Sequence, residues 1–174
     1  MHDDWPRLLE TWHEFYLLIG TAGLTLTGLL FVIVSFGART VADQAETGVP
    51  AFISPNAVFF TAVLVVSAVF LVPEIPRAAV GWFLCLGSFA SLAYLVSTRA
   101  HRRWSENNLG RLDWIWYIAL PVLSYLLLLA SGVGLLRQVE SSMDGAAFSV
   151  VLLLVVGIRN AWDLALWLAA RERA

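Results

Sequence analysis

Five long apolar stretches follow one another along the chain and restrict it to one class of fold. Each is 18 to 25 residues long, and they cover residues 15–37, 55–72, 78–98, 115–136 and 146–170. About 20 helical residues cross the ~30 Å hydrocarbon core of a bilayer. Because no water reaches the backbone there, a spanning segment closes its hydrogen bonds within a helix. The sequence therefore predicts an all-α integral membrane bundle of five transmembrane helices.

The composition argues against the main alternative, a water-soluble helical bundle. Of the 174 residues, 59% are apolar and 14% are charged, whereas soluble domains have about 45–50% and about 25%. Helices of a soluble bundle also show a polar face over much of their circumference, which these stretches lack. Since the stretches leave only short connections, we expect residues 1–174 to form a single transmembrane domain.

Prolines mark several expected boundaries. Ser54 followed by Pro55 is a typical start for the second helix, because proline suits the first helical position. The proline-rich segment 72–77 predicts a tight connection that makes the second and third helices an antiparallel hairpin. Pro121 lies inside the stretch 115–136, where its missing N–H should bend the helix.

Arginine is distributed unequally between the two ends of the expected bundle. One end carries Arg7, Arg77 and Arg137, and the other carries Arg39, Arg99, Arg102, Arg103, Arg111, Arg171 and Arg173. Cytoplasmic loops carry the excess of basic residues. We therefore expect the N-terminus outside and the C-terminus in the cytoplasm.

The segment 99–114 is the most basic part of the chain. Its arginines are Arg99, Arg102, Arg103 and Arg111. Such a cytoplasmic loop can bind anionic lipid or a protein partner, with about 1 kcal/mol per arginine from the surface potential. Four arginines only just reach that cluster size, so the favoured interpretation is a loop that sets the topology.

Three polar residues interrupt the last apolar stretch. Arg159, Asn160 and Asp163 lie on one face of the expected helix. A charge near the centre of a span costs roughly 2.5–3.5 kcal/mol, so this face should meet protein or water. Arg159 and Asp163, four residues apart, can pair. We expect a buried ion pair that fastens the bundle, and a functional site is the alternative.

A stripe in the first span is the expected partner of that face. It consists of small or hydroxyl side chains with one valine: Thr21, Thr25, Gly28, Val32 and Ser35. Small residues let helices approach closely, and hydroxyls supply hydrogen bonds between helices in lipid. The sequence therefore predicts a helix-packing stripe against the fifth helix. Gly87 and Ser91 form a smaller patch of the same kind in the third span.

The segments "WHEFYLLIGTAGLTLTGLLFVIVS" (12–35) and "IRNAWDLALW" (158–167) resemble those of small bacterial multi-pass inner-membrane proteins of unknown function. The resemblance extends over the chain in the order of its spans. It implies a bacterial inner (plasma) membrane setting. It implies no activity, because the motifs serve helix packing and interfaces.

Motifs for catalysis or cofactors are not found in the sequence. It has no serine-hydrolase, zinc-protease, paired-cysteine or phosphate-loop motif. Glu10 and His13 have the spacing of a carboxylate metal site, but such bundles need a second pair. The net charge of −2 and the lack of basic segments interleaved with aromatics argue against nucleic acid as a partner. We expect no catalytic residue, cofactor or metal.

Two main function classes remain. The first is a non-enzymatic accessory or scaffold protein whose partners are the lipid bilayer and either further copies or a larger membrane complex. The second is a small homo-oligomeric channel or transporter with the polar face of the fifth helix near the pathway. A lipid-modifying enzyme using Asp113 or Asp163 is a third, which lacks a supporting base or nucleophile. The first class is favoured.

Overall fold

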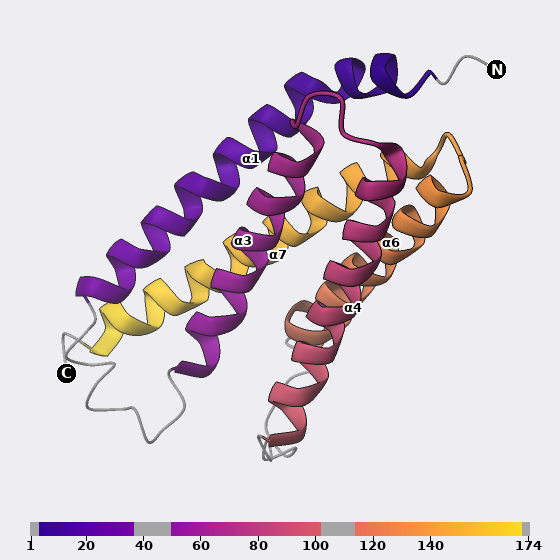
Figure 1. The fold of residues 1–174 in the computed structure, drawn as a ribbon. Coiled ribbons are helices and arrows are strands. Elements are labelled where there is room, and N and C mark those ends of the chain that lie inside the picture. The colour runs from indigo at the N-terminus through magenta and orange to yellow at the C-terminus, as the bar shows by residue number, and fades with distance from the viewer. Residues whose placement is uncertain (1–3, 37–49, 102–113, 172–174) are drawn as a thin grey trace.

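The computed structural model describes residues 4–36, 50–101 and 114–171, and every regular element in these ranges is a helix (Figure 1). The all-α expectation is confirmed. The elements are α1 (Trp5–Phe36), α3 (Pro50–Phe70), α4 (Arg77–His101), the π-helix η2 (Ile115–Ala119), α6 (Leu120–Leu136) and α7 (Ser142–Arg171).

Four of these helical segments are long and apolar enough to cross a membrane. They are Trp5–Ser35, Arg77–Ser97, Ile115–Leu136 and Ser142–Leu166. The remaining expected span corresponds to α3. Its apolar part, Asn56–Phe70, is shorter than each of these four segments. The helices therefore suit a multi-pass membrane protein.

Two helices begin earlier than expected. α1 starts at Trp5 instead of residue 15, because Trp5 is anchored: its side chain is 4% exposed, and its Nε1 donates a hydrogen bond to the carbonyl oxygen of Ile75 at 2.7 Å. The guanidinium of Arg77 lies 5.2 Å from the Trp5 ring centre. α3 starts at Pro50, so the expected start at Ser54 and Pro55 is wrong.

The helices pack as a row in the order α1, α3, α7, α6, α4. The expected hairpin of α3 and α4 is not formed as a packed pair, although a short connection joins them. The two helices diverge from this connection and touch little (Figure 1). α7, the last helix in the chain, therefore occupies the middle of the row.

Each neighbouring pair in the row meets at a glycine. These glycines are Gly23 of α1 against α3, Gly157 of α7 against α3, Gly145 of α7 against α6, and Gly132 of α6 against α4. A Cβ atom at any of them would lie 3.2 Å or less from an atom of the neighbouring helix. Small residues are what allows helices in lipid to approach this closely.

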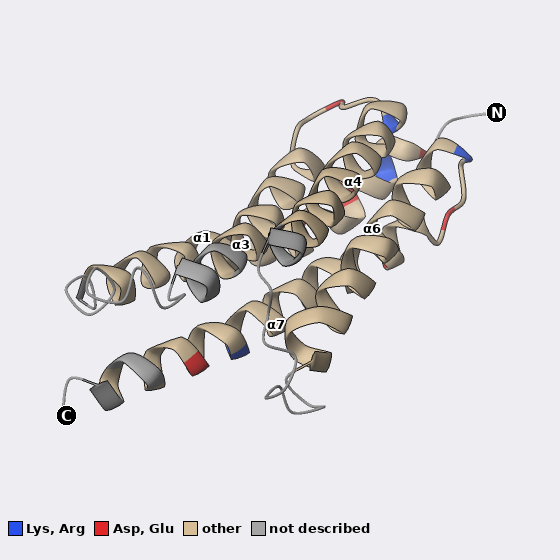
Figure 2. Ribbon diagram, turned by 90° about the horizontal axis from the view of Figure 1, so that it is seen from below, with Lys and Arg blue, Asp and Glu red and all other residues tan. Residues whose placement is uncertain are grey.

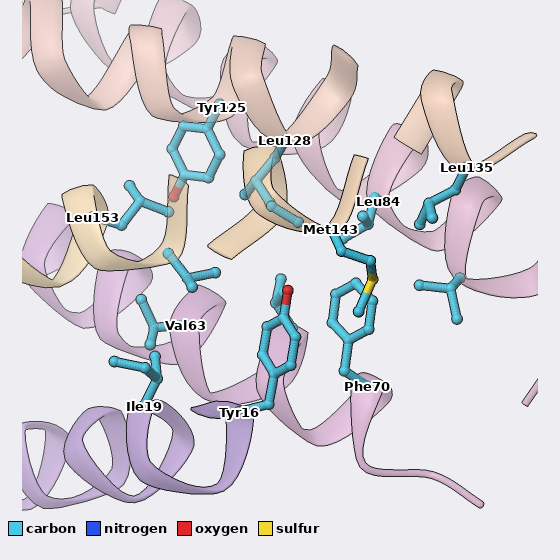
Figure 3. Close-up of a cluster of buried hydrophobic side chains, with 14 of the residues drawn as sticks. Tyr16, Ile19, Val63, Phe70, Leu84, Tyr125, Leu128, Leu135, Met143 and Leu153 are labelled. Carbon is cyan, nitrogen blue, oxygen red and sulfur yellow. The ribbon is translucent and has the colours of Figure 1, made fainter. Parts of the chain in front are cut away.

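Large side chains fill the space between these contacts (Figure 3). Tyr16 of α1 stacks on Phe70 of α3 with ring centres 4.2 Å apart. Leu128 of α6 and Met143 of α7 are buried in the same cluster. α6 and α7 are also joined by a hydrogen bond from the hydroxyl of Ser149 to the carbonyl oxygen of Ser124.

Substitution of Gly132 tests the contact between α4 and α6. A Cβ there would lie 2.9 Å from the carbonyl oxygen of Gly81 and 3.0 Å from the backbone nitrogen of Cys85. Because backbone cannot move aside as a side chain can, we expect Gly132→Ala to lower the free energy of unfolding by about 1–3 kcal/mol. Denaturation in detergent micelles measures this.

The matched control is Gly87→Ala on α4. No atom of another described helix lies within 4 Å of a Cβ at Gly87, so this variant changes only helix propensity, which favours alanine by about 0.5–1 kcal/mol. Equal stability of the two variants would contradict the close contact.

Candidate functional site

Pro121 sets the local backbone of the candidate site. It is the second residue of α6 and has no N–H to donate to the preceding turn. Just before it, the N–H of Leu120 bonds to the carbonyl oxygen of Ile115, which gives the wider turn of a π-helix. The bend expected at Pro121 therefore takes the form of η2. Single π-turns within helices often occur at functional sites.

η2 supplies the side chains that support the charged residues of α7. The guanidinium of Arg159 lies 4.8 Å from the ring centre of Trp116. The hydroxyl of Tyr117 donates a hydrogen bond to Oδ2 of Asp163 at 3.1 Å. We call Arg159, Asp163, Trp116 and Tyr117 the Arg159 cluster.

Arg159 and Asp163 pair along the helix, but loosely. Nη2 of Arg159 lies 3.9 Å from Oδ2 of Asp163, longer than a hydrogen bond. Their side chains are 37% and 38% exposed. The expected burial of this pair is therefore not found: the pair lies on the outside of the bundle, and among the described residues η2 covers it from one side.

The third predicted residue, Asn160, does lie inside the bundle. It is 3% exposed, and its Oδ1 has no hydrogen-bond partner among the described residues. Asn56 of α3, 1% exposed, has no partner for either polar side-chain atom in the same part of the chain. The ring of Phe60 on α3 contacts Gly157 on α7, and the two helices run in opposite directions. Asn56 precedes Phe60 by about one turn, and Asn160 follows Gly157 by about one turn. The two asparagines therefore lie at a similar level of the bundle.

The Arg159 cluster lies far along α7 from the end of the bundle that holds Asp144. Asp144 is in the first turn of α7, and Arg159 and Asp163 follow it by about 22 Å and about 28 Å along the helix axis. Of the charged residues that Figure 2 colours, most lie at the end of the bundle that holds the N-terminus, and this pair lies apart on α7. At this depth the charged groups can extend to the headgroup region.

The predicted stripe of α1 is not buried against α7 in the part of the chain that the structure describes. Gly28 has no neighbouring atom within 4 Å of a Cβ, and the hydroxyls of Thr21, Thr25 and Ser35 donate to carbonyl oxygens of their own helix four residues earlier. All four residues are exposed. α1 packs instead through Gly20 and Gly23 against α3. The small patch on α4 is similar, since Gly87 is exposed and Ser91 half-buried.

The predicted basic segment lies mainly outside the described residues. Arg102, Arg103 and Arg111 belong to the undescribed range 102–113. Arg99 belongs to the last part of α4, which continues to His101, so its backbone is helical.

Three residues of this region were missed as site residues. Trp116 and Tyr117 were not predicted as site residues; the signal was Pro121, which frees backbone groups in the turn that carries them. Asn56 was passed over within an apolar stretch, although an amide inside a span is itself an unusual polar group.

The Arg159 cluster is suited to binding polar or charged groups. It offers one cation, one anion and a phenol that orients the anion. Within the described part of the chain, no group of three or more His, Cys, Asp or Glu side chains could hold a metal ion. Comparison with known proteins gave no match: no family model, curated protein or solved structure is similar to the chain.

Removal of the Tyr117 hydroxyl tests the support that η2 gives to Asp163. A hydrogen bond to a charged group contributes about 1.5–3 kcal/mol, and partial exposure reduces it, so we expect Tyr117→Phe to cost about 1 kcal/mol. In an Asp163→Leu background the same change should cost less, because this hydrogen bond is then absent. A double-mutant cycle of unfolding free energies measures the difference.

Tyr16→Phe is the matched control for this cycle. The Tyr16 hydroxyl is buried without a hydrogen-bond partner in the described ranges, so its removal should leave stability unchanged or raise it. Identical costs of Tyr117→Phe with and without Asp163 would show that the hydrogen bond does not stabilise the protein.

Proposed function

We propose that the chain is a non-enzymatic accessory or scaffold protein of a bacterial inner (plasma) membrane. The observation that supports this role is that both outer helices of the row keep an open glycine face. In the part of the chain that the structure describes, no atom of another helix lies within 4 Å of a Cβ at Gly28 of α1 or Gly87 of α4. In contrast, the glycines between the helices of the row are in tight contact.

The open face of α1 is well suited to a further membrane helix. The hydroxyls of Thr21 and Thr25 already bond within α1, at 2.7 Å and 2.8 Å, so lipid leaves none of them unsatisfied. Around them Gly28 gives a flat surface that allows close approach. The partner in this proposal is a helix of a second copy or of a larger membrane complex.

The proposed orientation has the N-terminus outside and the C-terminus in the cytoplasm. Nine described charged residues lie near the end that holds the N-terminus: six acidic residues (Asp4, Glu10, Glu14, Glu74, Glu140 and Asp144) and three arginines (Arg7, Arg77 and Arg137). The scarcity of basic residues agrees with an outer side.

A homo-oligomeric channel or transporter is the second candidate. It is favoured by the partial exposure of Arg159 and Asp163 on the outside of the single chain, because assembly could enclose this pair in a pathway. Solute flux in liposomes that Arg159→Leu abolishes, without loss of folding, would favour this class over the scaffold.

Enlargement of Gly28 tests the scaffold proposal. We expect Gly28→Leu to weaken association with the partner at least about tenfold, because a side chain there prevents close approach. The melting temperature of the single chain should not change, since nothing lies within 4 Å. Mass measurement in detergent and co-purification from membranes report the association.

Ala130→Leu on α6 is the control for association. Ala130 is also exposed but belongs to neither outer helix of the row. A wild-type chain that stays monomeric and co-purifies with no other protein would refute the scaffold role.

Single cysteines at Ser105 and Ser141 test the orientation. In a Cys85→Ala background, an impermeant thiol reagent added to intact cells should label position 141 and not position 105. Permeabilised cells, in which both positions should react, provide the control. The reverse labelling in intact cells would invert the proposed topology.

A further inference from the structure

We propose that Arg159 and Asp163 together bind the headgroup of a zwitterionic phospholipid that carries a primary ammonium group. The phosphate lies on Arg159 and the ammonium on Asp163. This inference goes beyond the scaffold role and does not depend on it.

Both charged groups have unused hydrogen-bonding capacity. A guanidinium has five N–H donors. Nη1 of Arg159 is buried, whereas Nη2 is 3.9 Å from the carboxylate of Asp163, too far for a hydrogen bond, and the side chain is 37% exposed. Asp163 accepts one hydrogen bond, from Tyr117, at Oδ2. Its carboxylate can accept about four. The pair therefore has room for a ligand that donates to one group and accepts from the other.

The arrangement of the Arg159 cluster leaves one side open. Trp116 covers one face of the guanidinium, and Tyr117 contacts the carboxylate. The remaining surface is exposed, 37% for Arg159 and 38% for Asp163. No described helix of the row lies beyond it, so in a bilayer this surface faces lipid.

The order of the two charges along α7 matches the order of charges in such a lipid. Arg159 lies about one turn deeper in the membrane than Asp163, near the end of a ~30 Å core. In a zwitterionic headgroup the phosphate is attached nearer to the acyl chains, and the ammonium follows it by two carbons. This match does not depend on which side of the membrane α7 ends.

Apolar side chains flank the pair where acyl chains would lie. Phe148 and Val155 of α7, which lie deeper in the membrane than Arg159, are 60% and 45% exposed. They occupy the same broad side of the helix as Arg159. A lipid bound by its headgroup at the pair can therefore lay its acyl chains along these residues.

The chemistry of the pair selects among headgroups. With an anionic lipid that has no ammonium, the phosphate and Asp163 would carry two negative charges against the single positive charge of Arg159, so one would lack a counter-charge. A quaternary ammonium cannot donate a hydrogen bond to the carboxylate, and the Trp116 face that could attract it is taken by Arg159. A primary ammonium satisfies the carboxylate directly.

Native mass spectrometry of the full chain tests the proposal. The protein is given equal amounts of phosphatidylethanolamine and phosphatidylglycerol with identical acyl chains. We expect the wild type to retain phosphatidylethanolamine about tenfold over phosphatidylglycerol, as a charge-assisted hydrogen bond implies. Asp163→Asn should lose this preference and bind more phosphatidylglycerol, a gain that an unfolded variant cannot produce.

Arg137→Gln, which removes an exposed arginine at the opposite end of the bundle, should keep the preference. Equal retention of both lipids by the wild type, or no effect of Asp163→Asn, would overturn the proposal. Displacement of the lipid by water-soluble phosphoethanolamine would overturn the assignment to a membrane lipid. A lipid-free dimer that protects the pair would overturn it in favour of a protein partner.

Discussion

Close contact between helix backbones at glycines is the constraint on which the bundle depends. Inside lipid, apolar side chains gain little by leaving lipid for protein, so helices associate through tight packing and hydrogen bonds. In this chain Gly23, Gly157, Gly145 and Gly132 each bring a neighbouring helix close. Large side chains such as Tyr16 and Phe70 then fill the remaining space. The order of the helices in the row is therefore set by which neighbouring helix each of these four glycines faces.

The charged pair depends on a different feature, the π-helix before Pro121. The wider turn of η2 presents Trp116 and Tyr117 to α7, where one covers Arg159 and the other holds Asp163. A regular helix would place these two side chains differently about its axis. One proline therefore changes how two charges are held on a neighbouring helix, and it leaves them exposed on the outside of the bundle.

The sequence predicts the helices well and their contacts poorly. The length of an apolar stretch determines a spanning helix directly, so the helical regions are found, and the pairing of Arg159 with Asp163 follows from their spacing. A helix packs through the face that fits its partner helix, and this partner is far away in the sequence. In α1, Gly20 and Gly23 face α3, while Gly28 on another side is open. Both sides contain small residues, so composition alone cannot distinguish them.

The position of α7 also has a consequence for how the protein assembles during synthesis. α1 packs with α3 and α4 packs with α6, whereas α3 and α4 touch little. Among the described helices, α7 is synthesised after the other four α-helices, and it is the one that contacts both pairs. Until it inserts, the membrane holds two helix pairs joined only by a short connection. Completion of the bundle is therefore a late, long-range event, and the buried faces of α3 and α6 stay open to lipid or to other membrane proteins until then.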